Sequence, residues 1–304
     1  MSFYKSMNFR DYLIAGRRVR LWGDVDKVVQ MAVRSFQPFV AGDVVDKPLL
    51  EIVISTDIAF DKTKYTLLTQ FDLEDDLGVC SFWSDDEGYA LVMENGRDSV
   101  LFVCDKEVER VCSNIKPSLS MDYISFVRFG LWFVINMAFV LDGCSAVHSS
   151  TVVCRGGAVM FLGESGTGKS THTRLWLENI SGAELLNDDS PFVACDDEGV
   201  KVYGSPWSGK TSCYKNECYP LRAVVRLSQA PYNKIRPLHK LQAIGALLPS
   251  LPPAFVYDKR LEDALLGVLS KVLGKVSVYH LECLPDADAA QLSFNTIFGD
   301  DVKY

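Results

Sequence analysis

The stretch Ala158-Val-Met-Phe-Leu-Gly-Glu-Ser-Gly-Thr-Gly-Lys-Ser170 decides the fold of this chain. Its five leading apolar residues predict a buried strand, and residues 163–170 match the pattern GxxxxGK[ST] at every fixed position. Residues 169–178 continue as a predicted helix. A strand, a glycine-rich loop and a helix in this order can cradle phosphate groups. Glycines let backbone N–H groups turn inward, and the helix N-terminus adds partial positive charge.

The pattern predicts a role for each residue of the loop. Lys169 is expected to reach the β- and γ-phosphates of a nucleotide, and the Ser170 hydroxyl is expected to coordinate Mg²⁺. We therefore predict Mg-ATP as the ligand, with an unliganded glycine-rich turn as the alternative. The expected nucleotide-binding residues are Gly163, Glu164, Ser165, Gly166, Thr167, Gly168, Lys169, Ser170 and Thr171.

Two adjacent acids follow the next predicted strand. Residues 185–189 form an apolar run that ends in Asp188 and Asp189. In a phosphate-binding α/β domain such a strand end lies beside the phosphate loop and can hold Mg²⁺. One carboxylate could bind the metal while the other takes a proton from an attacking hydroxyl. A solvated turn before Pro191 is the alternative, whereas the acidic run at residues 196–199 predicts a surface hairpin turn.

The region from His148 to Asp189 resembles the catalytic domain of HPr kinase/phosphorylase, whose P-loop fold is related to phosphoenolpyruvate carboxykinase. His148 precedes Gly163 by fifteen residues, the loop reads Gly-x-Ser-Gly-x-Gly-Lys-Ser, and the acidic pair follows the loop's helix, as in that family. This resemblance implies that Asp189 is the general base toward a serine hydroxyl and that Asp188 supports the metal. It also implies that His148 lies close to the reacting phosphate.

The chain departs from that family in two places. Ser190 stands where the family has a third acid, and the Arg-Gly-rich segment associated with the phosphorylase reaction is missing. Residues 204–210 occupy that part of the chain. Lys210 could bring a second positive charge to a transferring phosphoryl group, or it could be an exposed lysine of a hairpin loop. Arg222 and Arg226, on the next predicted strand, are further candidates to face the site.

These observations predict an ATP-dependent kinase that transfers the γ-phosphate to a hydroxyl. The preferred acceptor is a serine of a protein or peptide, and a small-molecule hydroxyl is another. The predicted catalytic residues are Asp189, His148, Lys169 and Lys210. A non-catalytic nucleotide-binding sensor is the main alternative. A phosphoenolpyruvate carboxykinase-type enzyme is the third, and the shortness of the chain and the lack of an evident second-metal His-Lys set disfavour it.

The rest of the chain predicts an α/β (α+β) fold in two parts. Residues 1–117 predict a β-rich N-terminal domain, and residues 118–304 predict an HPr kinase-like, carboxykinase-like P-loop domain that opens with an apolar helix at 120–141. The N-terminal domain is also expected to hold a helix near 25–36. The remaining predicted elements are strands at 50–56, 65–69, 89–94, 99–103, 147–154, 221–227 and 276–281 and helices at 238–248 and 261–272.

Composition narrows the classes of partner. A net charge of −8 over 304 residues argues against a general nucleic-acid binder, which needs a basic face. Nine cysteines without a CxxC pair predict reduced thiols and a cytoplasmic location. The N-terminus lacks the features of a signal peptide. The apolar run at 129–141 is shorter than the roughly 20 residues that a bilayer requires, so no membrane span is expected. Self-association is left open.

Overall fold

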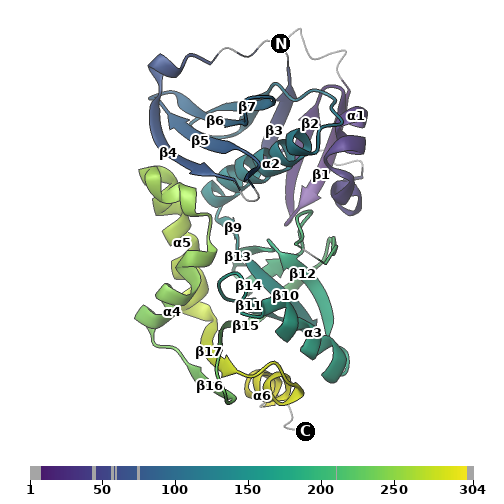
Figure 1. The fold of residues 1–304 in the computed structure, drawn as a ribbon, viewed down its shortest axis with the longest axis vertical. Coiled ribbons are helices and arrows are strands. Elements are labelled where there is room, and N and C mark those ends of the chain that lie inside the picture. Colours follow the sequence, from purple (N-terminus) through teal and green to yellow (C-terminus); the bar gives the residue numbers. More distant parts are fainter. Residues whose placement is uncertain are drawn as a thin grey trace. The chain divides into compact units, whose positions relative to one another are not determined.

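The computed structural model describes residues 8–42, 46–55, 58, 60–73, 76–209 and 211–299. Its internal contacts divide the chain into two compact units. The first comprises residues 1–142 and 254–262, and the second comprises residues 143–253 and 263–304. Each unit contains one extended β-sheet with helices, which confirms the predicted mixed α/β class (Figure 1). None of the nine cysteines, all within the described residues, forms a disulfide.

The described strands of the first unit form an eight-stranded sheet in the order β1-β2-β3-β8-β7-β6-β5-β4. Neighbouring strands are antiparallel except β2 with β3 and β3 with β8. The strands are β1 (Phe9–Ile14), β2 (Arg17–Trp22), β3 (Leu50–Ile54), β4 (Thr66–Asp72), β5 (Val79–Ser84), β6 (Gly88–Glu94), β7 (Ser99–Asp105) and β8 (Arg110–Ser113).

The four strands predicted in this part of the chain are confirmed, with residue 56 outside the described residues. The helix predicted near 25–36 is shorter: α1 (Val25–Met31) ends early, and a 3₁₀ helix follows at Arg34–Phe39. Pro38 lies inside that second segment. A proline lacks the backbone N–H that a continuous α-helix would use, so a single long helix is disfavoured there.

Helix α2 (Met121–Leu141) belongs with the first unit. It begins after Ser120, whose Oγ accepts a hydrogen bond from the Tyr123 N–H, and it lies against β6 and β7. The Phe133 ring packs 5.0 Å from that of Phe82 on β5. The predicted boundary before residue 118 therefore differs from the observed division, because the apolar surface of α2 packs on the first sheet.

By length and composition, α2 could cross a membrane: it has 21 residues and its most apolar 18-residue window has a mean hydropathy of 1.9. The apolar run counted in the sequence, residues 129–141, therefore covers only part of this helix. However, 67% of that window is buried inside the protein. The observed role of α2 is that of a core helix.

The described strands of the second unit follow the order β12-β10-β11-β15-β14-β13-β9, and β17 lies between β15 and β16. The first part of the long strand β15 pairs with β14, and its later part pairs with β11 and β17. Strands β11, β15 and β17 are parallel, whereas β10 is antiparallel to both β11 and β12. The strands are β9 (Cys144–Ala146), β10 (Ser149–Cys154), β11 (Gly157–Leu162), β12 (Glu184–Asp189), β13 (Phe192–Asp196), β14 (Gly199–Tyr203), β15 (Cys218–Gln229), β16 (Lys234–Pro237) and β17 (Ser277–Cys283).

The α-helices among the described residues after 143 are α3 (Lys169–Asn179), α4 (Lys240–Leu247), α5 (Lys259–Lys275), whose first four residues fall in the first unit, and α6 (Ala287–Phe298). The first three confirm predicted helices, and the hairpin turn predicted at 196–199 joins β13 to β14. Helix α6 is not foreseen in the sequence. It is capped by Asp286, whose Oδ1 accepts a hydrogen bond from the Ala289 N–H at 2.9 Å.

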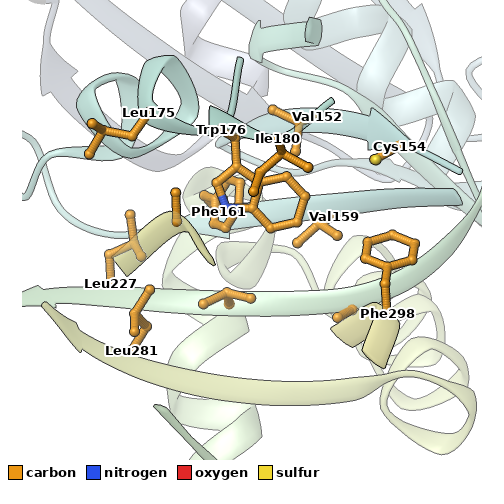
Figure 2. Packing of buried hydrophobic residues seen from close by; sticks show 13 residues of the cluster. Val152, Cys154, Val159, Phe161, Leu175, Trp176, Ile180, Leu227, Leu281 and Phe298 are labelled. Carbon is orange, nitrogen blue, oxygen red and sulfur yellow. The ribbon is translucent and has the colours of Figure 1, made fainter. Parts of the chain in front are cut away.

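A cluster of buried apolar side chains packs α3 onto the sheet (Figure 2). Trp176 lies at its centre, fully buried, with its ring 5.5 Å from that of Phe161 on β11. Its Nε1 donates to Ser293 Oγ of α6 at 2.9 Å. Burying so large an aromatic surface strongly favours this placement. The helix start, and with it the glycine-rich loop, is therefore held at one end of β11.

Candidate functional site

The glycine-rich loop joins β11, whose residues are all buried, to the exposed start of α3. Gly163 begins the loop where a Cβ would lie 2.3 Å from Thr167 Oγ1, so a side chain there would displace Thr167. Gly168 precedes the helix with φ of 102°, a left-handed conformation that favours glycine. Thr167 stiffens the turn, because its N–H and its hydroxyl both donate to the Glu164 carbonyl. The loop thus has the compact strand-loop-helix form predicted for a phosphate cradle.

Lys169 folds back over this loop. Its Nζ donates to the Gly163 carbonyl at 2.7 Å and lies 3.4 Å from the Glu164 carbonyl. Partial burial lowers the pKa of the Lys169 ammonium below its usual range, and the carboxylates of Asp189 and Asp188 oppose that shift. A phosphate oxygen would replace a neutral carbonyl as the partner of this cation, and charge-assisted hydrogen bonds are the stronger kind.

The strand register brings His148 and Asp189 to the loop. Strand β10 lies between β11 and β12 and pairs antiparallel with both, so that Ser149 lies opposite Asp189 and Ser150 lies opposite Phe161. The start of β10 and the ends of β11 and β12 consequently meet at one end of the sheet. There His148 Nδ1 lies 3.2 Å from Asp189 Oδ1, with both side chains partly exposed to solvent.

The two acids occupy different environments. Asp188 is buried and accepts a hydrogen bond at Oδ1 from Ser150 Oγ at 2.8 Å. Thr173 Oγ1 of α3 donates in turn to Ser150 Oγ at 2.8 Å. Asp189 is more exposed and contacts His148 instead. Successive residues of a strand point to opposite faces of the sheet, so adjacent carboxylates at a strand end are separated in this way.

The side chain of Asn187 holds the acidic strand end in place through hydrogen bonds. It is fully buried, and its Oδ1 accepts hydrogen bonds from the N–H groups of Asp189 and Ser190 at 3.0 and 2.8 Å. Its Nδ2 donates to the Trp207 carbonyl at 2.8 Å. Asp189 also pairs with Ser208 in an isolated β-bridge. The segment from Gly204 that the sequence singled out therefore lies beside the acids.

The predicted residue Lys210 lies outside the described residues. Its neighbours can be placed. The Gly209 N–H donates to the Asp188 carbonyl at 3.0 Å, and Thr211 lines the same groove as Asp188.

The two candidate arginines of β15 lie in different surroundings. Arg226 pairs with Leu162 in the register of β11 and β15, at the point where the loop begins. Its guanidinium lies 3.4 Å from the Glu164 carboxylate and 3.5 Å from the Ala246 carbonyl. Arg222 lies nearer the start of the strand, where its guanidinium carbon is 5.9 Å from the centre of the Phe298 ring. Of the two, Arg226 is the arginine at the loop.

A groove of about 380 Å³ runs beside the start of α3. Ser170 and Asp188, the two predicted metal ligands, lie on the same groove, and Arg174 with two leucines forms another part of its wall. Its lining residues are Ser170, Thr171, Thr173, Arg174, Leu177, Leu185, Asp188 and Thr211.

The residues present fit the nucleotide and metal that the motif implies. The Gly163 position leaves no room for a Cβ, and the first N–H groups of a helix such as α3 lack intrahelical partners. Ser170 and Asp188 supply a hydroxyl and a carboxylate oxygen to one groove. Mg²⁺ is usually held by one or two such protein oxygens, together with phosphates and water. Among the described residues, no group of three or more His, Cys, Asp or Glu side chains could hold a metal ion by itself.

Ser150, Thr173 and Asn187 are site residues that sequence reasoning missed. Small polar residues are common in strands and helices, and nothing in their spacing distinguishes them. One signal was present: three hydroxyl residues, Ser149, Ser150 and Thr151, open a strand whose first half pairs with the acidic strand end.

Comparison with protein-family models gives no match, and no curated protein matches the sequence. Among solved structures, the HPr(Ser) kinase/phosphatase from Coxiella burnetii is similar at 11% sequence identity, with a TM-score of 0.32. The similarity covers 52% of this chain and 91% of that one. A likeness of this size carries no argument about activity. The functional interpretation of this chain rests on its own residues and their geometry.

Proposed function

We propose that the second unit is an ATP-dependent, HPr kinase-like phosphotransferase that transfers the γ-phosphate to a hydroxyl, with a serine of a protein or peptide as the acceptor. The phosphates would lie along residues 163–171, where backbone N–H groups and Lys169 offset their charge. Ser170 and Asp188 would hold Mg²⁺. The cation supplies charge neutralisation between the phosphates.

Asp189 is the proposed general base. Its carboxylate is more accessible than that of Asp188, and His148 Nδ1 lies 3.2 Å from it. A hydroxyl that docks against Asp189 would lose its proton to this carboxylate as its oxygen attacks the terminal phosphorus. The bond between that phosphorus and the oxygen bridging it to the β-phosphate would break, and ADP would leave. The imidazole would hold the carboxylate in place and lie next to the transferring group. Charge builds on the equatorial phosphate oxygens during transfer, and Lys169 is the cation placed to stabilise it.

The observation that carries the proposal is the strand register at one end of the sheet. Strand β10 sets His148 against Asp189, and the adjacent strand β11 delivers the loop that carries Lys169. Burial lowers the pKa of the Lys169 ammonium, and the charges of Asp189 and Asp188 act against that shift. A binding-only module would need the loop but not a base beside it.

The test uses the full chain with ATP labelled in the γ-phosphate, Mg²⁺, a library of serine-containing peptides and a lysate of the encoding organism. Binding of a non-hydrolysable ATP analogue is measured in parallel by calorimetry. We expect Lys169→Ala to abolish analogue binding. Asp189→Asn should retain binding and lose transfer by a factor of 10² or more, on the order of a general-base contribution.

Asp197→Asn is the matched control, because it removes the same charge from the exposed β13–β14 turn and should leave both readouts unchanged. Transfer that persists in Asp189→Asn would remove the base assignment. Tight analogue binding by the unaltered chain without transfer to any acceptor would replace the kinase with a nucleotide sensor.

A further inference from the structure

We propose that Ser150 and Thr173 are positioning residues that hold the Asp188 carboxylate in the orientation needed to bind the divalent cation. This inference rests on the proposed nucleotide and metal site. It does not require that phosphoryl transfer takes place.

The three side chains form a continuous buried hydrogen-bonded chain. Thr173 Oγ1 donates to Ser150 Oγ and Ser150 Oγ donates to Asp188 Oδ1, each at 2.8 Å. Their exposed fractions are 4%, 1% and 8%. A buried carboxylate requires hydrogen bonds, and a donor that is itself held by a second hydroxyl has little freedom to turn away. With Oδ1 engaged by Ser150, Oδ2 is the oxygen that we assign to the cation.

The same chain links the two proposed metal ligands. Thr173 lies on α3 one turn after Lys169 and three residues after Ser170, so it moves with the helix start. Asp188 lies on β12, which is separated from β11 by β10. Ser150, on β10, bridges the two. The position of the Ser170 hydroxyl relative to the Asp188 carboxylate is therefore set through these two hydroxyls.

The surroundings of Ser150 differ from those of the residues further along β10, because its hydroxyl contacts Thr173 and Asp188. Further along β10, Val152 and Cys154 enter the apolar cluster beneath α3, where Phe161 and Trp176 lie (Figure 2). A hydroxyl at this position is explained by the carboxylate it contacts.

The neighbouring residue Ser149 offers a matched control. It is equally buried, lies on the same strand, and its hydroxyl contacts only the Val147 carbonyl and Thr151 Oγ1 among the hydrogen bonds of the described residues. Removing it deletes the same atoms from the same strand without touching Asp188.

The experiment measures binding and involves no turnover. The full chain is titrated with a non-hydrolysable ATP analogue, first without divalent cation and then at increasing Mg²⁺, and Mn²⁺ binding to the analogue complex is followed by electron paramagnetic resonance. The variants are Ser150→Ala and Thr173→Val, with Ser150→Thr and Thr173→Ser as conservative replacements that keep a hydroxyl.

We expect Ser150→Ala to raise the Mg²⁺ concentration for half-saturation about 10- to 100-fold, the range for losing a hydrogen bond behind a metal ligand. Thr173→Val should raise it less. Metal-free analogue affinity should not change, the hydroxyl-keeping variants should restore Mg²⁺ binding, and Ser149→Ala should match the unaltered chain.

The inference is overturned if Ser150→Ala and Thr173→Val, folded by circular dichroism, reach half-saturation at the Mg²⁺ concentration of the unaltered chain. If Ser150→Ala does not fold, Thr173→Val decides, since it keeps the shape of the side chain. An unaltered chain that binds the Mg²⁺-analogue complex but transfers no phosphate would refute the kinase alone.

Discussion

Acidification should weaken the helix that carries the loop, through one buried histidine. His172 lies on α3 with 2% of its surface exposed, its ring 4.8 Å from that of Phe161 and its Nε2 3.2 Å from Ser293 Oγ. No hydrogen-bond partner for its Nδ1 is found among the described residues. Burial lowers the pKa of this imidazole from 6.5 to about 4. The folded protein therefore keeps His172 neutral where an unfolded chain would protonate it.

The sign and size of the effect follow from this difference in pKa. Between the two values the unfolded state binds more protons, so stability falls as the pH drops through 6.5 and levels off below about 4. Linkage gives a loss of about 2 kcal/mol in the free energy of unfolding from pH 7 to pH 5, and about 3 kcal/mol when the titration is complete.

The assay is urea denaturation at pH 7 and pH 5, for the unaltered chain and for His172→Gln. Other groups also titrate in this window, so the relevant quantity is the difference between the two pH dependences. We expect the variant to be less stable at pH 7 but to lose about 2 kcal/mol less on acidification. Parallel losses in the two proteins would refute the reasoning, because they would show that His172 does not titrate differently on folding.

Three further predictions concern the loop and its support. Arg226→Gln should weaken binding of the ATP analogue about tenfold, as expected for losing a hydrogen bond to a charged group, whereas Arg222→Gln, on the same strand, should not weaken it. Equal effects of the two variants in calorimetry would show that Arg226 is not part of the site. Gly163→Ala should weaken analogue binding because its Cβ would lie 2.3 Å from Thr167 Oγ1, and adding Thr167→Ala should restore part of the affinity. If the double variant binds no better than Gly163→Ala, this contact is not the cause of the weaker binding. Trp176→Ala should lower the free energy of unfolding by about 3–5 kcal/mol in urea denaturation, and a loss below 1 kcal/mol would contradict its central place in the core.

Local features were predictable from the sequence because their causes are local. The glycines, the preceding apolar run and the helix that follows residue 168 are neighbours along the chain, so they locate β11, the loop and α3. The strand ending in Asp188 and Asp189 and the turn at 196–199 were recognisable for the same reason. The role of His148 came only through a family spacing, and it remains a prediction.

Tertiary structure decided which of these pieces meet. The insertion of β10 between β11 and β12 places Ser150 against Asp188, 38 residues away, and Thr173 against Ser150, 23 residues away. The pairing of β11 with β15 brings Arg226, rather than Arg222, to Glu164 at a separation of 62 residues. Strand order and register set such contacts, and both depend on the packing of whole faces. The sequence alone therefore determined the glycine-rich loop and its flanking elements. The assignment of α2 to the first unit, the separate environments of the two acids and the hydroxyls behind Asp188 depend on how the two sheets form.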